Sequence, residues 1–221
     1  MADRITRLTE KLKKISLAEP ENSYTKLASF LVSTDSMVGI HSIRVSGYAV
    51  VTGSEMGLPE SKLKVIFISA LLHDIGKMLV PSAILRKSSA LSRLEMDIVK
   101  HHPELGKRIL QGIDRYNPYA GYVLHHHEYF NGRGYPDGLS GLEIPEISRI
   151  IAVADAYEAL TSDRPYRKGI SHREAVTRLK MARNTQLDPE ITGYFLKAIK
   201  SFSKNEAWNS EFKMELWFPD A

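Results

Sequence analysis

The chain has 221 residues, the size of one large domain or of a domain with an appendage, and hydrophobic residues make up 43% of it. It contains no cysteine, which excludes disulfides, thiolate metal sites and cysteine nucleophiles. The formal net charge of +4 slightly favours a small anionic substrate and gives little support for binding to duplex DNA. Because no apolar segment approaches the length of a membrane span and residues 1–20 are charged throughout, we expect a cytoplasmic protein without a signal peptide.

Helical periodicity dominates the chain, and the sequence therefore predicts an all-α fold. In chain order, we expect an amphipathic helix up to about Lys14, a second helix over residues 22–33 and a longer helix over residues 35–56. The apolar run "VIFISALL" then predicts a buried helix that leads directly into His73 and Asp74. A buried charge is costly unless it is paired or binds a metal, so these two side chains need partners.

Capping signals and one long loop organise the rest of the chain. Gly76 is expected to stop the buried helix soon after its polar pair. Later helices begin at cap signals, which are Ser92 with Glu95, Ser171 with Glu174, and Asp188 with Pro189. Between residues 127 and 145, the glycines and prolines of "NGRGYPDGLSGLEIP" predict a long ordered loop, which is uncommon in a compact domain and often functional.

Histidines gather in one part of the chain, because seven of the eight lie between positions 41 and 127. A single histidine is most often a surface or hydrogen-bonded core residue, but a set that accompanies a buried "HD" pair favours metal binding. Neighbouring residues on a helix diverge by about 100°, so the pairs at 73–74 and 126–127 can point inward only near helix ends.

Imidazole and carboxylate ligands without sulfur suit iron, manganese, zinc or magnesium, and the high share of histidine disfavours magnesium alone. More than four such ligands suggest two ions bridged by a carboxylate, for which Asp74 is the natural candidate. Two ions of this kind can hold a hydroxide and clamp a phosphate, as in phosphohydrolases.

Further polar residues follow in the run "RIIAVADAYEALTSDRPYR". Asp155 alone could be a paired core aspartate, but beside an incomplete ligand set we favour it as another metal ligand. Arg164 and Arg167 lie three residues apart at the expected helix end. Their guanidinium groups suit phosphate oxygens, although a solvated basic helix end would have the same sequence.

Together these segments resemble the HD-GYP domain, a branch of the HD phosphohydrolases. The resemblance covers roughly residues 35–200 and rests on five motifs in the same order, which are "HSIRV", "LLHDIGK", "HHPELG", "HHHEYFNGRGYPDGL" and "RIIAVADAYEALTSDRPYR". It implies a compact helical fold and hydrolysis of the bacterial messenger cyclic di-GMP to linear pGpG, and often onward to GMP. Some members act on related cyclic dinucleotides such as cyclic GMP-AMP.

The resemblance also implies roles for individual residues. The metal ligands would be His41, His73, Asp74, His102, His126, His127 and Asp155. Lys77 would lie near the substrate phosphate, and the substrate would also contact Tyr135, Arg164 and Arg167.

Other positions are expected to lie outside the site or depart from the family pattern. His101 and His125 match no family ligand. Some members carry a glutamate one helical turn before the first histidine and hold three ions, but this chain has Met37 there. We therefore expect two divalent ions, iron or manganese. Asn131 replaces the usual aspartate of the loop and removes no ligand.

The expected organisation is an N-terminal helical extension over residues 1–34, the HD-GYP domain over residues 35–203 and a C-terminal tail over residues 204–221. Relatives often carry a sensory or receiver domain before the match. Regulation here would therefore come through a protein partner, or the chain is a fragment. The docking surface for such a partner would be the long loop over residues 127–145, which we call the GYP loop. The sequence does not indicate an oligomeric state.

The predicted reaction is phosphodiester hydrolysis by a hydroxide that two metal ions activate. Asp74 and Lys77 are the predicted catalytic residues, and Lys77 and the two arginines would stabilise charge on the phosphate oxygens. The leaving 3′ oxygen would take its proton from water or from Lys77. Two alternatives stay open. One is a cyclic-dinucleotide receptor or docking module with little turnover, and the other is an enzyme for a different substrate, either a nucleotide monophosphate or another cyclic dinucleotide such as cyclic GMP-AMP.

Overall fold

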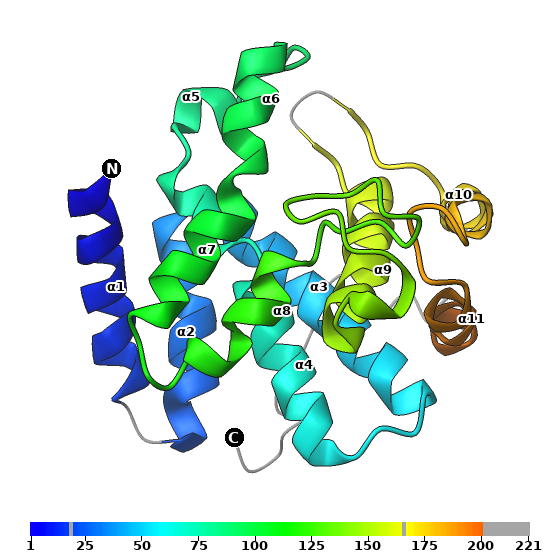
Figure 1. The fold of residues 1–221 in the computed structure, drawn as a ribbon, viewed down its shortest axis with the longest axis horizontal. Helices are drawn as coiled ribbons and strands as arrows, with labels where there is room; N and C mark the ends of the chain where they lie inside the picture. Colours follow the sequence, from blue (N-terminus) through cyan, green and yellow to red (C-terminus); the bar gives the residue numbers. More distant parts are fainter. Residues whose placement is uncertain (18–19, 165–166, 201–221) are drawn as a thin grey trace.

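The computed structural model describes residues 1–17, 20–164 and 167–200, and this part of the chain forms helices joined by loops, without a β-strand (Figure 1). The predicted all-α fold is confirmed. The α-helices and 3₁₀ helices are, in chain order, α1 (Ala2–Ser16), α2 (Pro20–Thr34), α3 (Ser36–Glu55), α4 (Glu60–Leu72), η1 (Ile75–Leu79), α5 (Ser82–Leu85), α6 (Arg93–Lys100), α7 (His102–Gln111), η2 (Asn117–Tyr119), α8 (Ala120–Leu124), η3 (Gly141–Glu143), α9 (Glu146–Thr161), α10 (His172–Ala182) and α11 (Pro189–Ala198).

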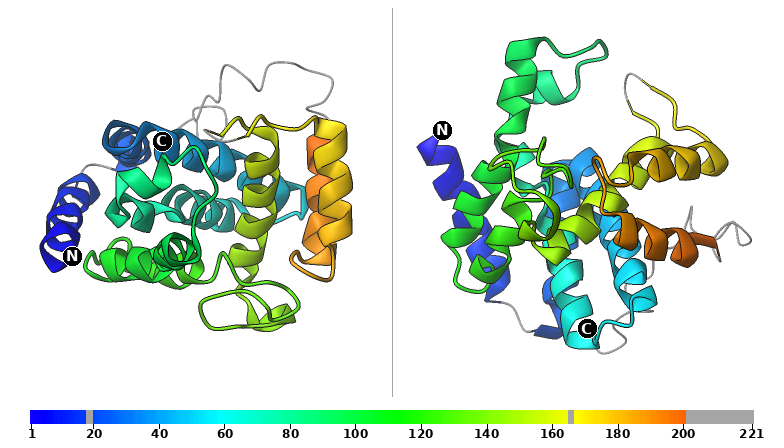
Figure 2. Two further views of the ribbon diagram at one scale, coloured as in Figure 1. Left: turned by 90° about the horizontal axis from the view of Figure 1, so that it is seen from above. Right: turned by 45° about the vertical axis from the view of Figure 1, so that its right-hand side comes forward.

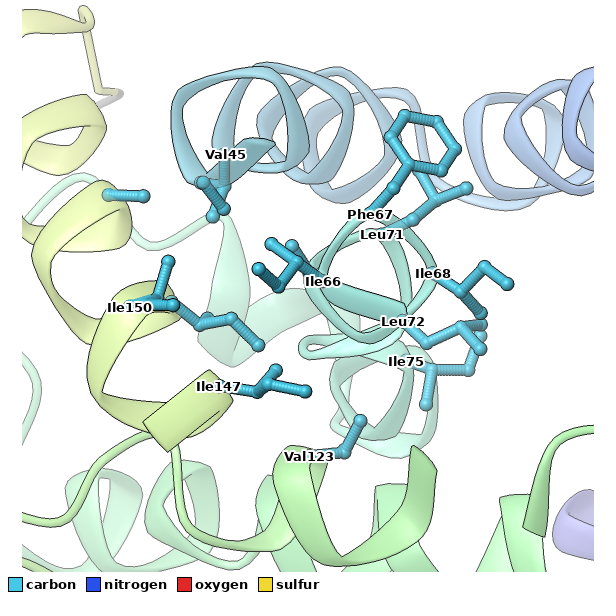
Figure 3. Packing of buried hydrophobic residues seen from close by; sticks show 14 of the residues in the cluster. Val45, Ile66, Phe67, Ile68, Leu71, Leu72, Ile75, Val123, Ile147 and Ile150 are labelled. Carbon is cyan, nitrogen blue, oxygen red and sulfur yellow. The ribbon is translucent and has the colours of Figure 1, made fainter. Parts of the chain in front are cut away.

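Helix α4 lies in the middle of the molecule and is surrounded by other helices (Figure 3). Every residue over 66–72 is buried, which explains why this segment is a continuous apolar run and not an amphipathic pattern. Phe67 meets Tyr24 of α2 edge to face, with ring centroids 5.8 Å apart. On another side, Ile147 and Ile150 of α9 belong to the same core. Helix α4 therefore holds its own C-terminal end, where the polar pair begins, inside the protein.

The first two helices share this core. Leu8 and Leu12 of α1 and Leu27 and Leu31 of α2 are buried in the same hydrophobic cluster. The predicted boundary between residues 34 and 35 stays a prediction, and the predicted tail over 204–221 lies outside the described residues. Among the described residues, no helix has the length and apolarity needed to cross a membrane.

The predicted role of Gly76 as a helix stop is wrong. Helix α4 ends at Leu72, and Gly76 lies inside η1 without a left-handed backbone conformation. A Cβ atom added at Gly76 would lie 1.9 Å from the carbonyl oxygen of His102. The glycine is therefore required because η1 and α7 approach each other backbone to backbone, a tertiary contact that local sequence does not show.

The segment "MDIVKHHPELGKRIL" is divided between two helices, because the chain turns at His101. The predicted capping box of Ser92 and Glu95 is present at the start of α6. Helices α5 and α6 contain no buried residue and project from the body of the molecule, as Figures 1 and 2 show. We call residues 80–100, which include both helices, the arm.

Helix α9 forms one wall of the core and carries α10 and α11 on its outer side (Figure 2). The loop before α9 contains a cis peptide bond between Tyr135 and Pro136. Its backbone is held from inside by Glu128, whose Oε1 accepts hydrogen bonds from the amides of Asp137 and Gly138 at 2.7 and 3.1 Å. The long loop predicted from its glycines and prolines is confirmed as an ordered segment.

The close approach at Gly76 can be tested by substitution. Gly76→Ala should lower the free energy of unfolding by about 1–3 kcal/mol, because the new methyl group would overlap backbone atoms of α7. The measurement is chemical denaturation of metal-free protein. Gly121→Ala is the matched control, since a Cβ at Gly121 meets no heavy atom within 4 Å. Equal midpoints for the two variants would contradict this role of Gly76.

Candidate metal centre

The seven predicted ligand side chains come from separate segments of the chain and meet in the interior. They form two sets, and within each set one ligand atom per residue lies within 4.8 Å of the others. The first set is His41, His73 and Asp155, and the second is Asp74, His102, His126 and His127. Five of these side chains are buried and two, His127 and Asp155, are partly buried.

Asp74 stands between the two sets. Its Oδ2 lies 3.4 Å from Nε2 of His41 and 3.3 Å from Nε2 of His73. Its Oδ1 lies 3.2 Å from Nε2 of His102 and 3.9 Å from Nε2 of His126. Each carboxylate oxygen thus faces a different set, which supports the predicted role of Asp74 as a bridge between two ions.

Helix ends orient three of the imidazoles. The Nδ1 atoms of His73, His102 and His126 lie 2.6, 2.8 and 2.6 Å from the carbonyl oxygens three residues earlier. Since a carbonyl oxygen only accepts, each Nδ1 carries the hydrogen of this bond and each Nε2 is left to face the interior. These carbonyls belong to the last turns of α4, α6 and α8, where the regular backbone hydrogen bonding of a helix ends. Placing a histidine just beyond a helix end therefore satisfies the backbone and directs Nε2 inward.

His41 is oriented by a carboxylate that sequence analysis did not identify. Its Nδ1 donates to Oε2 of Glu158 at 2.6 Å, and Glu158 also accepts from Arg164 at 2.8 Å and from Ser162. Glu158 is buried, with 2% of its surface exposed. The available signal was an acidic residue one turn after Asp155 within an apolar helical run. Carboxylates in this position commonly fix the tautomer of a metal-binding histidine.

The imidazoles of the second set are neutral. Burial lowers the pKa of His102, holds that of His126 well below its usual range and lowers that of His127 to about 3. The Nε2 atoms of His102 and His126 lie only 3.2 Å apart. Because both present lone pairs, they repel each other unless a cation lies between them and attracts both.

The first set carries excess negative charge. Burial by itself would lower the pKa of His41, but hydrogen bonds to Asp155, Asp74 and Glu158 raise it to about 10. Without a metal, the imidazole therefore holds a proton that Asp74 and Asp155 share, with Asp155 Oδ1 at 3.2 Å. A divalent cation would neutralise the same carboxylates in place of this proton, and its binding to His41 would release the proton.

The donor set fits divalent ions. The buried Nε2 atom of His73 and Oδ1 of Asp74 make no hydrogen bond among the described residues. Two ligands bound to one ion at about 2.1 Å lie roughly 3.0–3.4 Å from each other, and the distances from Asp74 to His41, His73 and His102 fall in this range. These side chains could therefore hold divalent metal, one ion in each set.

Lys77 and Arg164 add positive charge beside the ligands. Lys77 Nζ lies 2.6 Å from Oδ2 of Asp74, and Arg164 is held by Glu158. Arg167 is directed differently, because its Nη2 donates to the carbonyl oxygen of Ala159. All three residues line cavities next to the ligand sets.

Two cavities of opposite character flank the centre, and both are lined by His41, Lys77 and Arg164. The apolar cavity, of about 600 Å³, lies against the arm and is walled by residues such as Met37, Val38, Leu91, Met96 and Val99. The cationic cavity, of about 580 Å³, lies between α9 and α10 and is lined by Asp155, Arg167, Arg178 and Gln186 among others. The centre is therefore accessible from two sides.

Tyr135 lies over the second ligand set. Its ring stacks on His127, with centroids 4.9 Å apart, and Lys100 Nζ is 5.6 Å from its centroid. It does not line either of the two cavities described above. In this structure Tyr135 therefore restrains His127, while its predicted contact with substrate stays a prediction.

The positions expected to lie outside the ligand sets do so. His101 is exposed and donates to the carbonyl oxygen of Asp97, and His125 pairs with Asp137 at 2.9 Å. Asn131 caps the start of the loop, where its Oδ1 accepts from the amide of Arg133.

A family model described as "HD domain" matches residues 25–191, a range that contains all seven predicted ligands. A cyclic di-GMP phosphodiesterase of Pseudomonas aeruginosa is 38% identical over a region that covers 76% of this chain and 41% of that protein. The cyclic di-GMP phosphodiesterase response regulator RpfG of Xanthomonas campestris is 34% identical, with coverages of 86% and 51%. The chain thus spans about half the length, or less, of these two relatives.

A solved structure supports the fold independently. Bd1817 of Bdellovibrio bacteriovorus, described as an HDG"Y"P protein, is similar with a TM-score of 0.63 over 89% of this chain and 72% of that one. Its sequence identity is 20%, so the likeness concerns the arrangement of helices.

The two-ion arrangement generates a prediction about Glu158. Protein purified anaerobically should contain two divalent ions per chain by elemental analysis, one for each ligand set. Glu158→Gln should weaken the ion held by His41 by about 10–100-fold, because the imidazole loses its anionic partner. The ion of the second set should be retained in a chelator titration. Glu146→Gln, on the same helix, is the control, and loss of both ions together would contradict the assignment.

Proposed function

Because the chain belongs to the HD domain family, we propose that it is a metal-dependent phosphodiesterase that hydrolyses cyclic di-GMP to linear pGpG. The HD-GYP resemblance predicted from the sequence motifs is confirmed at the level of the family. The substrate is inferred from two relatives that are named cyclic di-GMP phosphodiesterases and that are 38% and 34% identical to this chain. Further cleavage of pGpG to GMP would use the same centre.

One observation carries this proposal. Seven side chains of ligand type, Asp74 among them, gather in two sets, and the two oxygens of Asp74 face different sets. Cationic residues lie beside them. A receptor without turnover would have no chemical need for two such sets, which favours an enzyme over a binding module.

The first ion would be held by His41, His73 and Asp155, the second by His102, His126 and His127, and Asp74 would contact both. When bound, such ions lower the pKa of water and neutralise negative charge on a phosphate. Five imidazoles and two carboxylates without a thiolate favour iron or manganese. A reducing cytoplasm, which suits a chain without cysteine, would keep iron in its divalent form.

Cationic side chains would bind and orient the phosphates. Lys77 lies against Asp74 and lines both cavities, so its ammonium group can reach the phosphate that is being cleaved. In this position it would stabilise charge on a phosphate oxygen or donate a proton to the leaving 3′ oxygen. Arg164 also lines both cavities, and its guanidinium group can bind the phosphate while Glu158 holds it. Arg167 lines the cationic cavity.

The GYP loop would also contribute to this site. Tyr135 restrains His127 by stacking, and we retain its hydroxyl and ring edge as a proposed contact for guanine. The exposed part of this loop is the surface that we propose for a regulatory protein partner.

The function can be tested by following cyclic di-GMP and its products by chromatography, with protein loaded anaerobically with Fe(II) or Mn(II). Asp74→Ala should abolish turnover, because the carboxylate faces both ligand sets. His101→Ala should retain the parent rate, since this imidazole is exposed and lies outside the sets. Undiminished turnover by the Asp74 variant would rule out the proposed centre. Parallel assays with cyclic GMP-AMP and cyclic di-AMP would establish the preferred substrate.

A further inference from the structure

The apolar cavity differs in chemistry from the rest of the site. Its volume of about 600 Å³ falls within the usual range for small-ligand sites. One wall belongs to α3, where Met37 and Val38 precede His41, and the opposite wall belongs to the arm, which contributes Leu91 and Met96. Its inner end reaches Asp74 and Lys77. An apolar chamber therefore opens directly from the place where a phosphate would lie.

The cationic cavity on the other side has a more polar lining. Arg167, Arg178 and Gln186 line it beside alanine and leucine side chains of α9 and α10, so it can bind phosphate and ribose oxygens. A nucleotide joins an anionic phosphate to a flat base that has large apolar faces and few polar edges. If the phosphate lies beside Lys77, the base fits the chamber, whose lining is mostly aliphatic and thioether groups, with Lys87 and Arg164 as further polar contacts.

We infer that the apolar cavity is a nucleobase subsite, in which one base of the cyclic dinucleotide lies between α3 and the arm. The inference rests on the proposed function and adds to it the residues that bind the base. Met37 and Val38 form the fixed wall, while Leu91 and Met96 form the wall supplied by the arm. The hydroxyl groups of nearby serines 88 and 89 are available to the polar edge of the base.

Substitutions in the arm can test the subsite without removing contacts of the hydrophobic core. No residue of α6 is buried, so truncating its apolar side chains removes no core contact. Met96 lines the cavity, whereas Leu94 and Ile98 of the same helix do not, and these two are 77% and 45% exposed. Helix α6 therefore supplies both the test position and matched control positions.

The experiment compares the double variant Leu91→Ala/Met96→Ala with the control Leu94→Ala/Ile98→Ala in the full chain loaded with Mn(II). Binding of the slowly hydrolysed phosphorothioate analogue of cyclic di-GMP is measured by calorimetry. The cavity variant should raise its Kd, and the KM for cyclic di-GMP, by about tenfold, because apolar contact with the base is lost. Its kcat and metal content should stay within about twofold of the parent values, since no ligand is changed. The control should match the parent in all four quantities.

Each outcome separates this inference from the proposed function. If the parent hydrolyses cyclic di-GMP and the cavity variant behaves like the control, the subsite is wrong and the phosphodiesterase stands. If the parent binds the analogue without hydrolysing any cyclic dinucleotide, and the cavity variant alone loses affinity, the subsite stands and the proposed activity fails. If the parent neither binds nor hydrolyses cyclic dinucleotides, both are overturned.

Discussion

The burial of the Asp74 carboxylate is the constraint on which the rest of the site depends. Only 1% of this residue is exposed, and its Oδ1 faces the Nε2 lone pairs of the neutral His102 and His126. The positive charges of Lys77, at 2.6 Å, and of the protonated His41, at 3.4 Å, lie on the side of Oδ2. Isolated buried charges and opposed lone pairs are both costly, and divalent cations between them would remove both costs together. The fold is therefore organised around a centre that is incomplete as protein alone.

The ends of three helices make this arrangement compatible with backbone hydrogen bonding. Regular backbone hydrogen bonding ends at the last turns of these helices, where carbonyl groups accept hydrogen bonds from Nδ1 of His73, His102 and His126. The same bonds leave Nε2 free to face Asp74. Short turns after α4 and α8 consequently bring adjacent polar residues inward, which a continuous helix could not do. The breaks in the helical pattern are thus part of the site.

The sequence indicated which side chains gather at the centre because each candidate ligand lies in a local motif whose polarity conflicts with its apolar surroundings. Glu158 was missed because the residue that explains it, His41, is 117 positions away in the chain. Gly76 was misinterpreted for a related reason. A glycine after a helix normally signals its end, whereas this one is required by contact with the backbone of His102. The sequence indicated which side chains have the chemistry of metal ligands. The contacts that orient those side chains depend on which helices pack together, and local motifs do not show this.

Met37 gives the centre its asymmetry. A carboxylate one turn before His41 would extend the polar centre toward the arm. Met37 stands at that position instead, and its thioether forms part of the apolar wall of the cavity. The opposite side, lined by Arg167 and Arg178, stays cationic. On the proposed function, a substrate with twofold symmetry would meet a site whose two sides differ, so one phosphate would lie over Asp74 while the other would lie beside Arg167 and Arg178. The two ester bonds would then be presented in turn.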